Sequence, residues 1–373
     1  MKQKSIFFTV TNDLVYDQRM IRICTTLSEN GYNITLIGRN RSFSKPLDKR
    51  SYVQKRLTCF FDKGKLFYFE YNLRLFCLLL FSKFDVICSI DLDTLVPGFL
   101  VSKLRGKVCV YDAHEFFTEV PEVVNRNFVK KVWEAVGYAI IPRLKYCYTV
   151  CESLSEVFFE KYKTEFEVIR NVPYKRNEQL KKRTFKEPNI ILYQGALNEG
   201  RGLEQAIEAM KSIDYANLWL VGEGDLSMSL RKLVKDLDLE KKVVFKGYVK
   251  PSDLPEITEK ATLGINLLEN KSLNYYYSLA NKAFDYIQAE IPAIHMNFPE
   301  YQKLNQSYNV SILVDNLDAV EIADSINKVL GNKELYLEIV ENCKAAKRIY
   351  IWEVEEQKLL DFYKKLFKTE SAQ

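Results

Sequence analysis

Residues 278–295, SLANKAFDYIQAEIPAIH, decide the fold because a short amphipathic helix passes directly into an apolar strand. Phe284, Ile287 and Ile291 fall at i, i+3 and i+7, the spacing of one helical face, which predicts that this face is buried. Lys282 and Asp285 lie three residues apart and therefore share a different face of the helix. A helix that leads at once into a strand is typical of an α/β protein.

Alternating strands and helices occur on both sides of that stretch. SIFFTVTND, NITLIG, FDVICSID and YCYTVCES are predicted strands within residues 1–171, and IILYQ, LWLV, VVFKG and LGINLL are predicted strands within residues 189–351. Such near-continuous apolar runs predict parallel sheets covered on both faces. Residues 172–188 are polar, basic and flanked by proline, which predicts an interdomain linker. We expect two doubly wound domains that bind ligands in a cleft, at the carboxyl ends of their strands.

The composition excludes several classes of protein. With 47% hydrophobic and 28% charged residues, the chain has an ordinary globular composition. Its eight cysteines show no zinc-type spacing, and several lie in apolar strands, which indicates a reducing compartment. The start MKQKSIFFTVTND turns polar too early for a signal peptide, and there is no run of 18 apolar residues to span a membrane. We therefore expect a cytoplasmic protein.

The net charge of +5 conceals a difference between the two halves. Residues 1–186 hold 32 Lys and Arg against 20 Asp and Glu, a net of +12, and the rest of the chain has a net of −7. A basic half favours an anionic partner, such as a phosphorylated lipid, a membrane surface or nucleic acid. Nucleic acid is disfavoured because no binding motif is recognisable. The apolar residues 73–84 fit an interfacial helix, or more commonly a buried one.

Three strand ends in the second half carry glycines that suit an anionic ligand. The loop YQGALNEGRGLEQ follows one strand and opens a helix, and its glycines allow the backbone to approach a ligand closely. Arg201 adds positive charge beside a helix N-terminus, which itself attracts anions. LVGEGD and FKGYV repeat the strand–glycine pattern. Each feature alone is equally a solvated turn, but together they favour a nucleotide cleft.

The start of the 278–295 helix extends this hypothesis. The free N–H groups of its first turn and the Lys282 ammonium suit a diphosphate. Asp285, one turn later, is placed to accept hydrogen bonds from the vicinal hydroxyls of a ribose. The alternative is a capped surface helix with a Lys–Asp pair.

These segments resemble, in the correct order, family 4 glycosyltransferases of the GT-B fold, in an LPNK/FEY-type subgroup from bacterial polysaccharide or glycolipid synthesis. The resemblance rests on YYYSLANKAFDYIQAEIPAI, YQGALNEGRGLEQAIEAM, LWLVGEGD, VVFKGYV, YDAHEFF, RNVP and WEVEEQKLL, and it covers nearly the whole chain. It implies an α/β GT-B protein with two Rossmann-like doubly wound domains facing a cleft. Residues 1–171 form the acceptor-side domain, residues 189–351 the donor domain, and residues 352–373 pack back on the first domain.

The resemblance also implies roles for individual residues. Asp285 takes the place of the ribose-binding Glu, and His114 matches the histidine near the transferred sugar. Two positions depart from the family pattern, because Tyr277 stands where a Glu is common and Ala196 where an Arg is common, which leaves the donor sugar open. The expected site comprises the catalytic residues His114 and Glu115, the donor-binding residues Gly195, Arg201, Gly222, Glu223, Tyr248, Ser278, Leu279, Ala280, Asn281, Lys282 and Asp285, and the acceptor-side residues Asp17 and Arg19.

The implied function is the transfer of a sugar from a nucleotide diphosphate sugar to a saccharide or polyprenyl-phosphate-linked acceptor, in bacterial surface glycan synthesis. The resemblance implies retention of configuration and no metal or other cofactor. The basic half adds an anionic membrane surface as a partner, on the inner face of the plasma membrane. Two alternatives stay open, namely a nucleotide-sugar 2-epimerase of the same fold and a degenerate transferase that serves as a scaffold.

Overall fold

The protein is represented by a computed structural model, which describes residues 3–15, 17–176 and 189–371. The chain divides into two compact units. Unit 1 comprises Met1–Asn171 together with Glu355–Gln373, and unit 2 comprises Val172–Val354. Most of the predicted linker, residues 177–188, lies outside the described residues.

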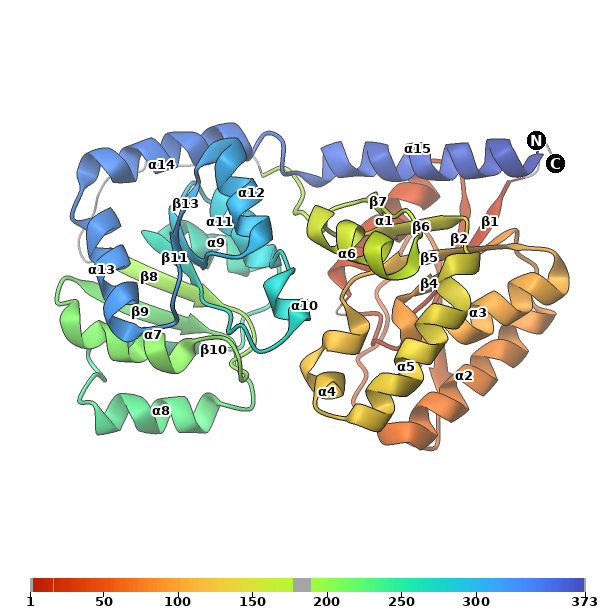
Figure 1. Cartoon of the computed structure of the whole chain (residues 1–373), viewed down its shortest axis with the longest axis horizontal. Helices are drawn as coiled ribbons and strands as arrows, with labels where there is room; N and C mark the ends of the chain where they lie inside the picture. The colour runs from red at the N-terminus through yellow and green to blue at the C-terminus, as the bar shows by residue number, and fades with distance from the viewer. Residues whose placement is uncertain (1–2, 16, 177–188, 372–373) are drawn as a thin grey trace. The chain divides into compact units, whose positions relative to one another are not determined.

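Unit 1 is built on a parallel sheet of seven strands in the order β3-β2-β1-β4-β5-β6-β7, with helices on both faces (Figure 1). The strand order reverses between β1 and β4. The central strands β1, β4 and β5 are almost wholly buried, as a sheet covered on both faces requires. The strands are β1 Ser5–Thr9, β2 Asn33–Asn40, β3 Val53–Thr58, β4 Val86–Ile90, β5 Val108–Ala113, β6 Tyr146–Thr149 and β7 Glu167–Val168.

The helices of unit 1 include most of the C-terminal helix α15, because Glu355–Gln373 belong to this unit. Its aromatic side chains contact unit 1, with ring centroids 6.3 Å apart for Tyr363 and Phe8 and 5.1 Å apart for Phe362 and Tyr148. The helices are α1 Gln18–Glu29, α2 Gly64–Phe81, α3 Asp91–Arg105, α4 Pro121–Val124, α5 Asn127–Ile140, α6 Glu152–Tyr162 and α15 Trp352–Ser371, with 3₁₀ turns η1 Phe117–Glu119 and η2 Ile141–Arg143.

Unit 2 repeats this architecture with six parallel strands in the order β10-β9-β8-β11-β12-β13. The order reverses between β8 and β11. The strands are β8 Asn189–Gln194, β9 Ala216–Val221, β10 Val243–Gly247, β11 Leu263–Asn266, β12 Ala293–Met296 and β13 Ser311–Val314. The helices are α7 Leu203–Ala209, α8 Ser227–Asp236, α9 Leu254–Lys260, α10 Leu273–Tyr276, α11 Asn281–Gln288, α12 Pro299–Tyr308, α13 Ala319–Leu330 and α14 Lys333–Ala346, with the 3₁₀ turn η3 Met210–Ser212.

The stretch 278–295 folds as its spacing predicts. Phe284 and Ile287 of α11 are buried against α14, in a cluster that includes Ile339. The helix ends at Gln288, and the chain turns through Glu290, whose φ of 55° lies in the left-handed region, before β12 begins. The face that carries Lys282 is also buried, so α11 is not the surface helix of the alternative interpretation.

Helix α2 is apolar on two opposite faces. Phe67, Tyr71, Leu75 and Leu79 pack against the sheet of unit 1. The opposite face carries an exposed stripe of Leu66, Phe69, Leu73, Cys77 and Phe81. The segment 73–84 is therefore buried on one face and exposed to solvent on the other. None of the helices in the described parts of the chain is long and apolar enough to cross a membrane.

Removal of a buried side chain from α15 tests its place in the core of unit 1. Leu366 is fully buried, so Leu366→Ala should lower the free energy of unfolding by about 2–5 kcal/mol. The matched variant Lys364→Ala, on an exposed position of the same helix, should change it little. Urea denaturation followed by circular dichroism measures both. Equal midpoints for the two variants would contradict this packing.

Candidate active site

The polar residues of both sheets gather at the carboxyl ends of the strands. In open parallel sheets, ligands bind at this edge, where the strand order reverses. The reversal lies between β8 and β11 in unit 2 and between β1 and β4 in unit 1. The predicted donor residues belong to unit 2, and the predicted catalytic and acceptor-side residues belong to unit 1, so each set is described within its own unit.

Two glycines bring the loops after β8 and β9 into direct backbone contact. Gly195 and Gly222 have φ of 138° and 137°, a region that other residues rarely adopt. A Cβ atom on Gly222 would lie 1.9 Å from the carbonyl oxygen of Gly195, so no larger residue fits there without movement. The Gly195 amide donates to the carbonyl of Val221 at 2.9 Å. These contacts form a close-packed backbone surface of Gly195 and Gly222, called the floor of the site, beside the start of α11.

Lys282 places a buried ammonium group over this floor. Its side chain is 9% exposed, and its Nζ lies 3.8 Å from the centroid of the Tyr193 ring. A Cβ atom on Gly195 would lie 3.4 Å from the same Nζ. Burial lowers the pKa of Lys282 well below its ordinary value, and the positive charge of Arg201 lowers it further. The charge of Asp285 opposes these two effects only in part, so an anionic ligand would relieve the remaining electrostatic cost.

Arg201 supplies the second positive charge. Its guanidinium carbon lies 4.9 Å from the centroid of the Tyr275 ring, and its Nε is buried without a hydrogen-bond partner in the described part of the chain. Gly200, directly before it, has φ of 82°, and a Cβ atom there would clash with the Tyr275 ring at 2.7 Å. The glycine therefore brings Arg201 and the aromatic ring together. Two neighbouring cations at the end of a strand are a pattern expected of a phosphate site.

Asp285 lies one helical turn from Lys282 and is oriented by the end of β8. Its Oδ2 accepts a hydrogen bond from Gln194 Nε2 at 2.8 Å, and Gln194 Oε1 in turn accepts from Thr258 Oγ1 at 2.7 Å. Arg176 Nη2 lies 3.5 Å from Oδ1. The carboxylate remains 27% exposed. A fixed, partly exposed acceptor of this kind suits the hydroxyl groups of a sugar.

The residues before α11 are less open than the sequence suggested. Among the described residues, no side-chain hydrogen bond caps the N-terminus of α11. The Ala280 amide, however, donates to Tyr301 Oη at 3.1 Å, and the Ser278 hydroxyl donates to the Tyr275 carbonyl at 2.9 Å. Leu279 packs partly against the core, and Asn281 is exposed. The Ala280 amide is therefore already used within the fold rather than directed at a diphosphate.

The other predicted donor residues lie on the surface of unit 2. Glu223 forms an ion pair with Arg231 at 2.7 Å, and Tyr248, just beyond β10, is 60% exposed. Of the two departures from the family pattern, Tyr277 packs edge to face on Tyr276 with centroids 5.0 Å apart. Ala196 is exposed, and its carbonyl accepts a hydrogen bond from Tyr193 Oη at 2.7 Å. Neither position adds a charge to the donor site.

In unit 1, His114 follows β5 and is held by a buried acid. Its Nε2 lies 2.9 Å from Asp112 Oδ2, and its backbone N–H donates to Asp91 Oδ1 at 2.9 Å. Burial would lower the pKa of His114, but the charge of Asp112 and their hydrogen bond outweigh this effect and raise it to about 9. His114 is therefore a cation at neutral pH. Glu115, the next residue, is exposed.

Arg19 and Asp17 have structural partners in unit 1. Arg19 is 3% exposed, and it donates to Asp112 from Nη2 at 3.1 Å and to the Ile169 carbonyl from Nη1 at 2.8 Å. Asp17 caps α1 by accepting from the Met20 amide at 3.0 Å. This geometry favours a supporting role for Arg19 over a direct acceptor contact.

Two acids at the start of α3 lie at the same edge and are absent from the predicted site. Burial raises the pKa of Asp91 to about 8 and that of Asp93 to about 7. Thr11 Oγ1, just after β1, donates to Asp93 Oδ2 at 2.5 Å. The signal for them was present in the sequence, because DLD follows a fully buried strand. No group of three or more His, Cys, Asp or Glu suited to a metal occurs in the described ranges.

These sites were compared with known proteins. Residues 175–346 match the family model "Glycosyl transferases group 1". This match covers slightly less than half of the chain and includes the whole donor site of unit 2. No curated protein sequence matches the chain. The match supports the prediction of a glycosyltransferase; the LPNK/FEY subgroup stays a prediction.

Solved structures show the fold of the whole chain. Sucrose-phosphate synthase from Thermosynechococcus elongatus has a TM-score of 0.80 at 16% identity, covering 98% of this chain and 100% of its own. HepE from Anabaena, in complex with UDP and glucose, has a TM-score of 0.77 at 16% identity, covering 97% and 100%. WaaG, a glycosyltransferase involved in lipopolysaccharide biosynthesis, has a TM-score of 0.73 at 14% identity, covering 95% and 98%. The chain has the two-domain GT-B fold, as predicted.

Lys282→Met should separate the stability of unit 2 from its ligand binding. The pKa of Lys282 is lower in the folded than in the unfolded chain, so the unfolded chain binds a proton more readily at this side chain. The free-energy cost of burying Lys282 is therefore greatest at low pH, and it disappears as the pH approaches the ordinary value of 10.5. The variant should therefore be more stable than wild type at pH 7, with a difference that shrinks as the pH rises. Its affinity for UDP should fall roughly 10- to 100-fold.

Thermal unfolding between pH 6 and 10 measures the first effect, and calorimetry with UDP measures the second. The control is Lys328→Met, on an exposed position of α13 in the same unit. A Lys282→Met protein that binds UDP as tightly as wild type would remove Lys282 from the donor site.

Proposed function

We propose that this protein transfers a sugar from a nucleotide diphosphate sugar to a saccharide or lipid-linked acceptor. The observation that carries the proposal is the group formed by Lys282, Arg201 and Asp285 in unit 2. It offers two cations, Lys282 and Arg201, and the carboxylate of Asp285, which is fixed by Gln194 but remains accessible. A diphosphate with an adjacent ribose presents the complementary chemistry. The same group lies inside the segment that matches the glycosyl transferases group 1 family.

The proposed chemistry follows from these charges. Cleavage of the bond between sugar and diphosphate leaves negative charge on the phosphate oxygens. Lys282, Arg201 and the uncapped start of α11 stabilise that charge, so the proposed reaction needs no metal or other cofactor. Asp285 is proposed to orient the ribose, and His114 of unit 1 is assigned to the transferred sugar on the basis of the family resemblance. Retention of configuration is part of the proposal and rests on the family resemblance.

The similar structures support a saccharide as the acceptor. HepE was solved with UDP and glucose, and WaaG takes part in lipopolysaccharide biosynthesis. We propose by analogy a bacterial surface glycan, built on a saccharide or a polyprenyl-phosphate-linked acceptor, as the product of this protein. Likeness at such low identity supports the class of reaction and leaves the sugar to experiment.

A panel of nucleotide sugars tests the proposed function. We expect the wild-type protein, with a lipid-linked or free saccharide acceptor, to release nucleoside diphosphate and form a glycosylated product with one donor. Asp285→Ala should raise the donor dissociation constant roughly 10- to 100-fold, because hydrogen bonds to a charged acceptor contribute about 1.5–3 kcal/mol. Mass spectrometry of the products and calorimetry of the donor provide the two readouts.

The same panel separates the alternatives. Conversion of the donor into its 2-epimer, without an acceptor, would replace the proposal by an epimerase. Binding of nucleotide without any turnover would favour a scaffold, for which the absence of charge at Tyr277 and Ala196 is the motivating feature.

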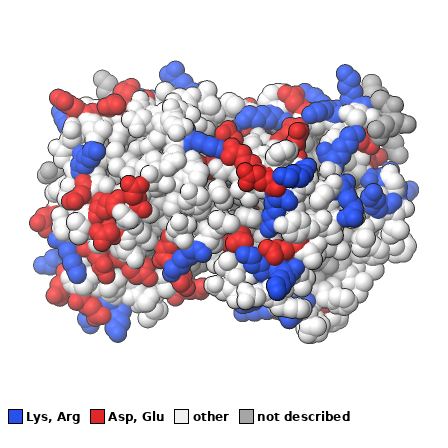
Figure 2. Space-filling view, in the orientation of Figure 1, with Lys and Arg blue, Asp and Glu red and all other residues white. Residues whose placement is uncertain are grey.

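We further propose that unit 1 meets an anionic membrane surface through α2. The exposed stripe of this helix includes Phe69 and Phe81, which are 71% and 85% exposed. Lys63, Lys65 and Lys83 are exposed near the two ends of the helix. An apolar stripe bordered by lysines is the composition that binds at the interface of anionic lipids. Figure 2 shows Asp and Glu gathered over α7 and α13 of unit 2, which makes unit 2 the less suitable surface.

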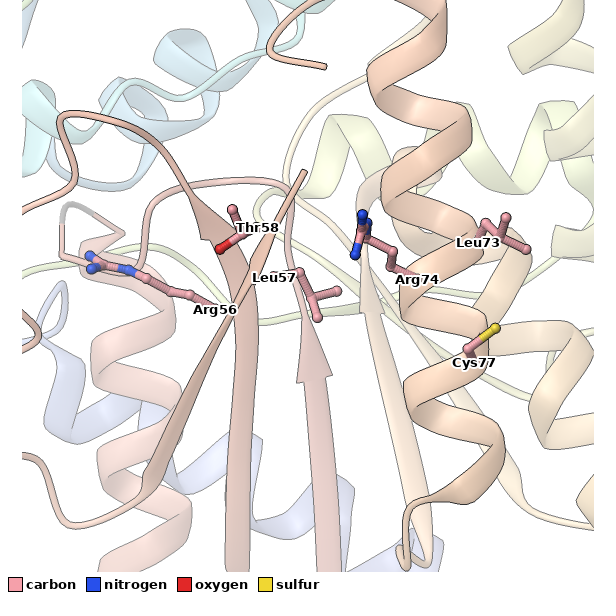
Figure 3. A pocket seen from close by; sticks show the side chains of 6 residues that line it. All are labelled: Arg56, Leu57, Thr58, Leu73, Arg74 and Cys77. Atoms are coloured by element: carbon pink, nitrogen blue, oxygen red, sulfur yellow. The ribbon is translucent and has the colours of Figure 1, made fainter. Parts of the chain in front are cut away.

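A shallow groove adjoins the same helix. Side chains of β3 and α2 line it, and Leu73 and Cys77 of the exposed stripe form one wall (Figure 3). Its two arginines are already engaged, Arg56 with Asp13 at 2.6 Å and Arg74 with Glu70 at 2.8 Å. The groove therefore offers mainly apolar contact, which suits acyl or prenyl chains. The residues that line it are Arg56, Leu57, Thr58, Leu73, Arg74 and Cys77.

Charges placed on the stripe test the membrane proposal. Wild-type protein should sediment with phosphatidylglycerol-containing vesicles at low salt and less so as salt rises, since each Lys contributes about 1 kcal/mol that salt screens. Phe69→Glu combined with Leu73→Glu should reduce the bound fraction severalfold. Phe159→Glu, on an exposed position of α6, is the control and should bind as wild type does. Equal sedimentation of the double variant and wild type would exclude α2 as the contact.

A further inference from the structure

We propose that Arg19 and Asp112 are positioning residues, which hold the imidazole ring of His114 through its Nε2 and leave Nδ1 as the ring nitrogen that contacts the substrate. The proposal rests on the proposed function for the identity of that substrate. It concerns two side chains that do not themselves reach the reacting atoms. The argument has three parts, namely the geometry of the three residues, the charges around them and the chemistry of the imidazole ring.

The geometry fixes the ring from one side. Asp112 lies in β5 and is fully buried, and its Oδ2 is 2.9 Å from Nε2 of His114. Arg19 of α1 holds the same carboxylate with Nη2 at 3.1 Å from Oδ1 and Nε at 3.4 Å from Oδ2. Its remaining Nη1 donates to the carbonyl of Ile169, beyond β7. Asp112 is therefore anchored by Arg19, which is itself held by the Ile169 carbonyl, and it cannot turn away from His114 without losing buried hydrogen bonds.

The charges around His114 single out Asp112 as the source of its positive charge. Burial would raise the pKa of Asp112, but Arg19 and His114 outweigh this effect and lower it. The neighbouring acids behave in the opposite way, since burial raises the pKa of Asp91 to about 8 and that of Asp93 to about 7. Glu115 is exposed, and Arg19 opposes protonation of His114. Asp112 is thus the buried acid that stays fully charged at neutral pH beside His114.

The imidazole chemistry explains why that charge matters. In a neutral histidine whose Nε2–H donates to Asp112, Nδ1 carries a lone pair and can only accept a hydrogen bond. In the cation, both ring nitrogens carry hydrogen, so Nδ1 becomes a donor. A donor aimed at an oxygen where negative charge develops lowers the barrier of group transfer. The negative charge of Asp112 therefore decides whether the free edge of His114 accepts or donates.

Arg19 supports this arrangement at a cost. A buried ion pair contributes little net stability, whereas a buried carboxylate without its partner is strongly destabilising. Arg19 therefore keeps Asp112 ionised inside the protein, although its own charge works against protonation of His114. The guanidinium carbon also lies 5.9 Å from the centroid of the Tyr148 ring, which packs it from β6. These contacts account for Arg19 more fully than a contact with an acceptor does.

Imidazole resonances test the proposal without any substrate. The chain has two histidines, His114 and His295. Burial lowers the pKa of His295, and the nearby charge of Lys282 adds a smaller effect in the same direction, to a value of about 3. Of the two histidines, only His114 should therefore titrate near pH 9. In Asp112→Asn, which keeps the shape of the side chain and removes its charge, the pKa of His114 should fall by two units or more. Asp93→Asn, the matched buried acid, should shift it by less.

The pH dependence of transfer provides the second readout. Lys282, whose pKa is also lowered, titrates in the wild type and the variant alike, so the effect of His114, which loses its proton near pH 9 in the wild type, is taken from the difference between their kcat/KM profiles. In Asp112→Asn, the decline due to His114 should begin at lower pH, so that kcat/KM at pH 8 falls about 10- to 100-fold while activity at pH 5 is largely retained. UDP affinity should not change, because the donor-binding cations belong to unit 2. A purely structural defect would lower activity at every pH.

The outcomes distinguish this proposal from the proposed function. A wild-type His114 that titrates near 6.5 overturns the proposal even if Asp112→Asn fails to fold. An Asp112→Asn protein whose His114 pKa and pH profile match wild type overturns it as well. A lowered His114 pKa together with no transfer from any donor supports the positioning by Asp112 and removes the proposed function instead.

Discussion

Parallel strand pairing is the constraint on which the rest of this structure depends. Parallel neighbours need helical crossovers, which cover both faces of the sheet and leave only the strand ends for polar groups. In unit 2, Gln194, Asn266 and Met296 close their strands at the same edge. In unit 1, Asp91 and His114 directly follow β4 and β5 at that edge. Both candidate sites arise from this rule. It also explains why residues that are far apart in the sequence lie together within one site.

The two units treat buried charge in different ways. Lys282 is desolvated and lies near Arg201, and the charge of Asp285 offsets this cost only in part, so a ligand of opposite charge would lower it further. Arg19 is equally buried, but Asp112 already neutralises it. A cation with its own counter-ion is part of the fold, whereas a cation that is only partly neutralised indicates a binding site. This distinction, rather than residue type, separates the donor site from the supporting contacts of unit 1.

Local patterns predicted the fold and the buried face of α11, because apolar spacing reports directly on secondary structure and burial. They could not show that Arg19 pairs with Asp112, since these residues are 93 positions apart and meet only after the sheet has formed. For the same reason, local patterns did not show that Asp91 accepts a hydrogen bond from the His114 amide, or that the Ala280 amide, predicted for the donor site, donates to Tyr301. The burial of helix α2 could not be predicted from its spacing, because apolar side chains occur on all of its faces and do not identify the one that packs against the sheet.

The two histidines show how strongly the surroundings determine the chemistry of one residue type. His295 of β12 is buried, stacked on Tyr301 with centroids 4.5 Å apart, and near the ammonium of Lys282. Desolvation and a neighbouring cation act in the same direction there, so the ring stays neutral. Around His114, desolvation is opposed by an ionised acid that Arg19 holds in place, and the ring becomes charged. Because His295 is neutral, it adds no third positive charge beside Lys282 and Arg201. Because His114 is charged, it adds a hydrogen-bond donor at a strand edge where unit 1 otherwise presents carboxyl groups.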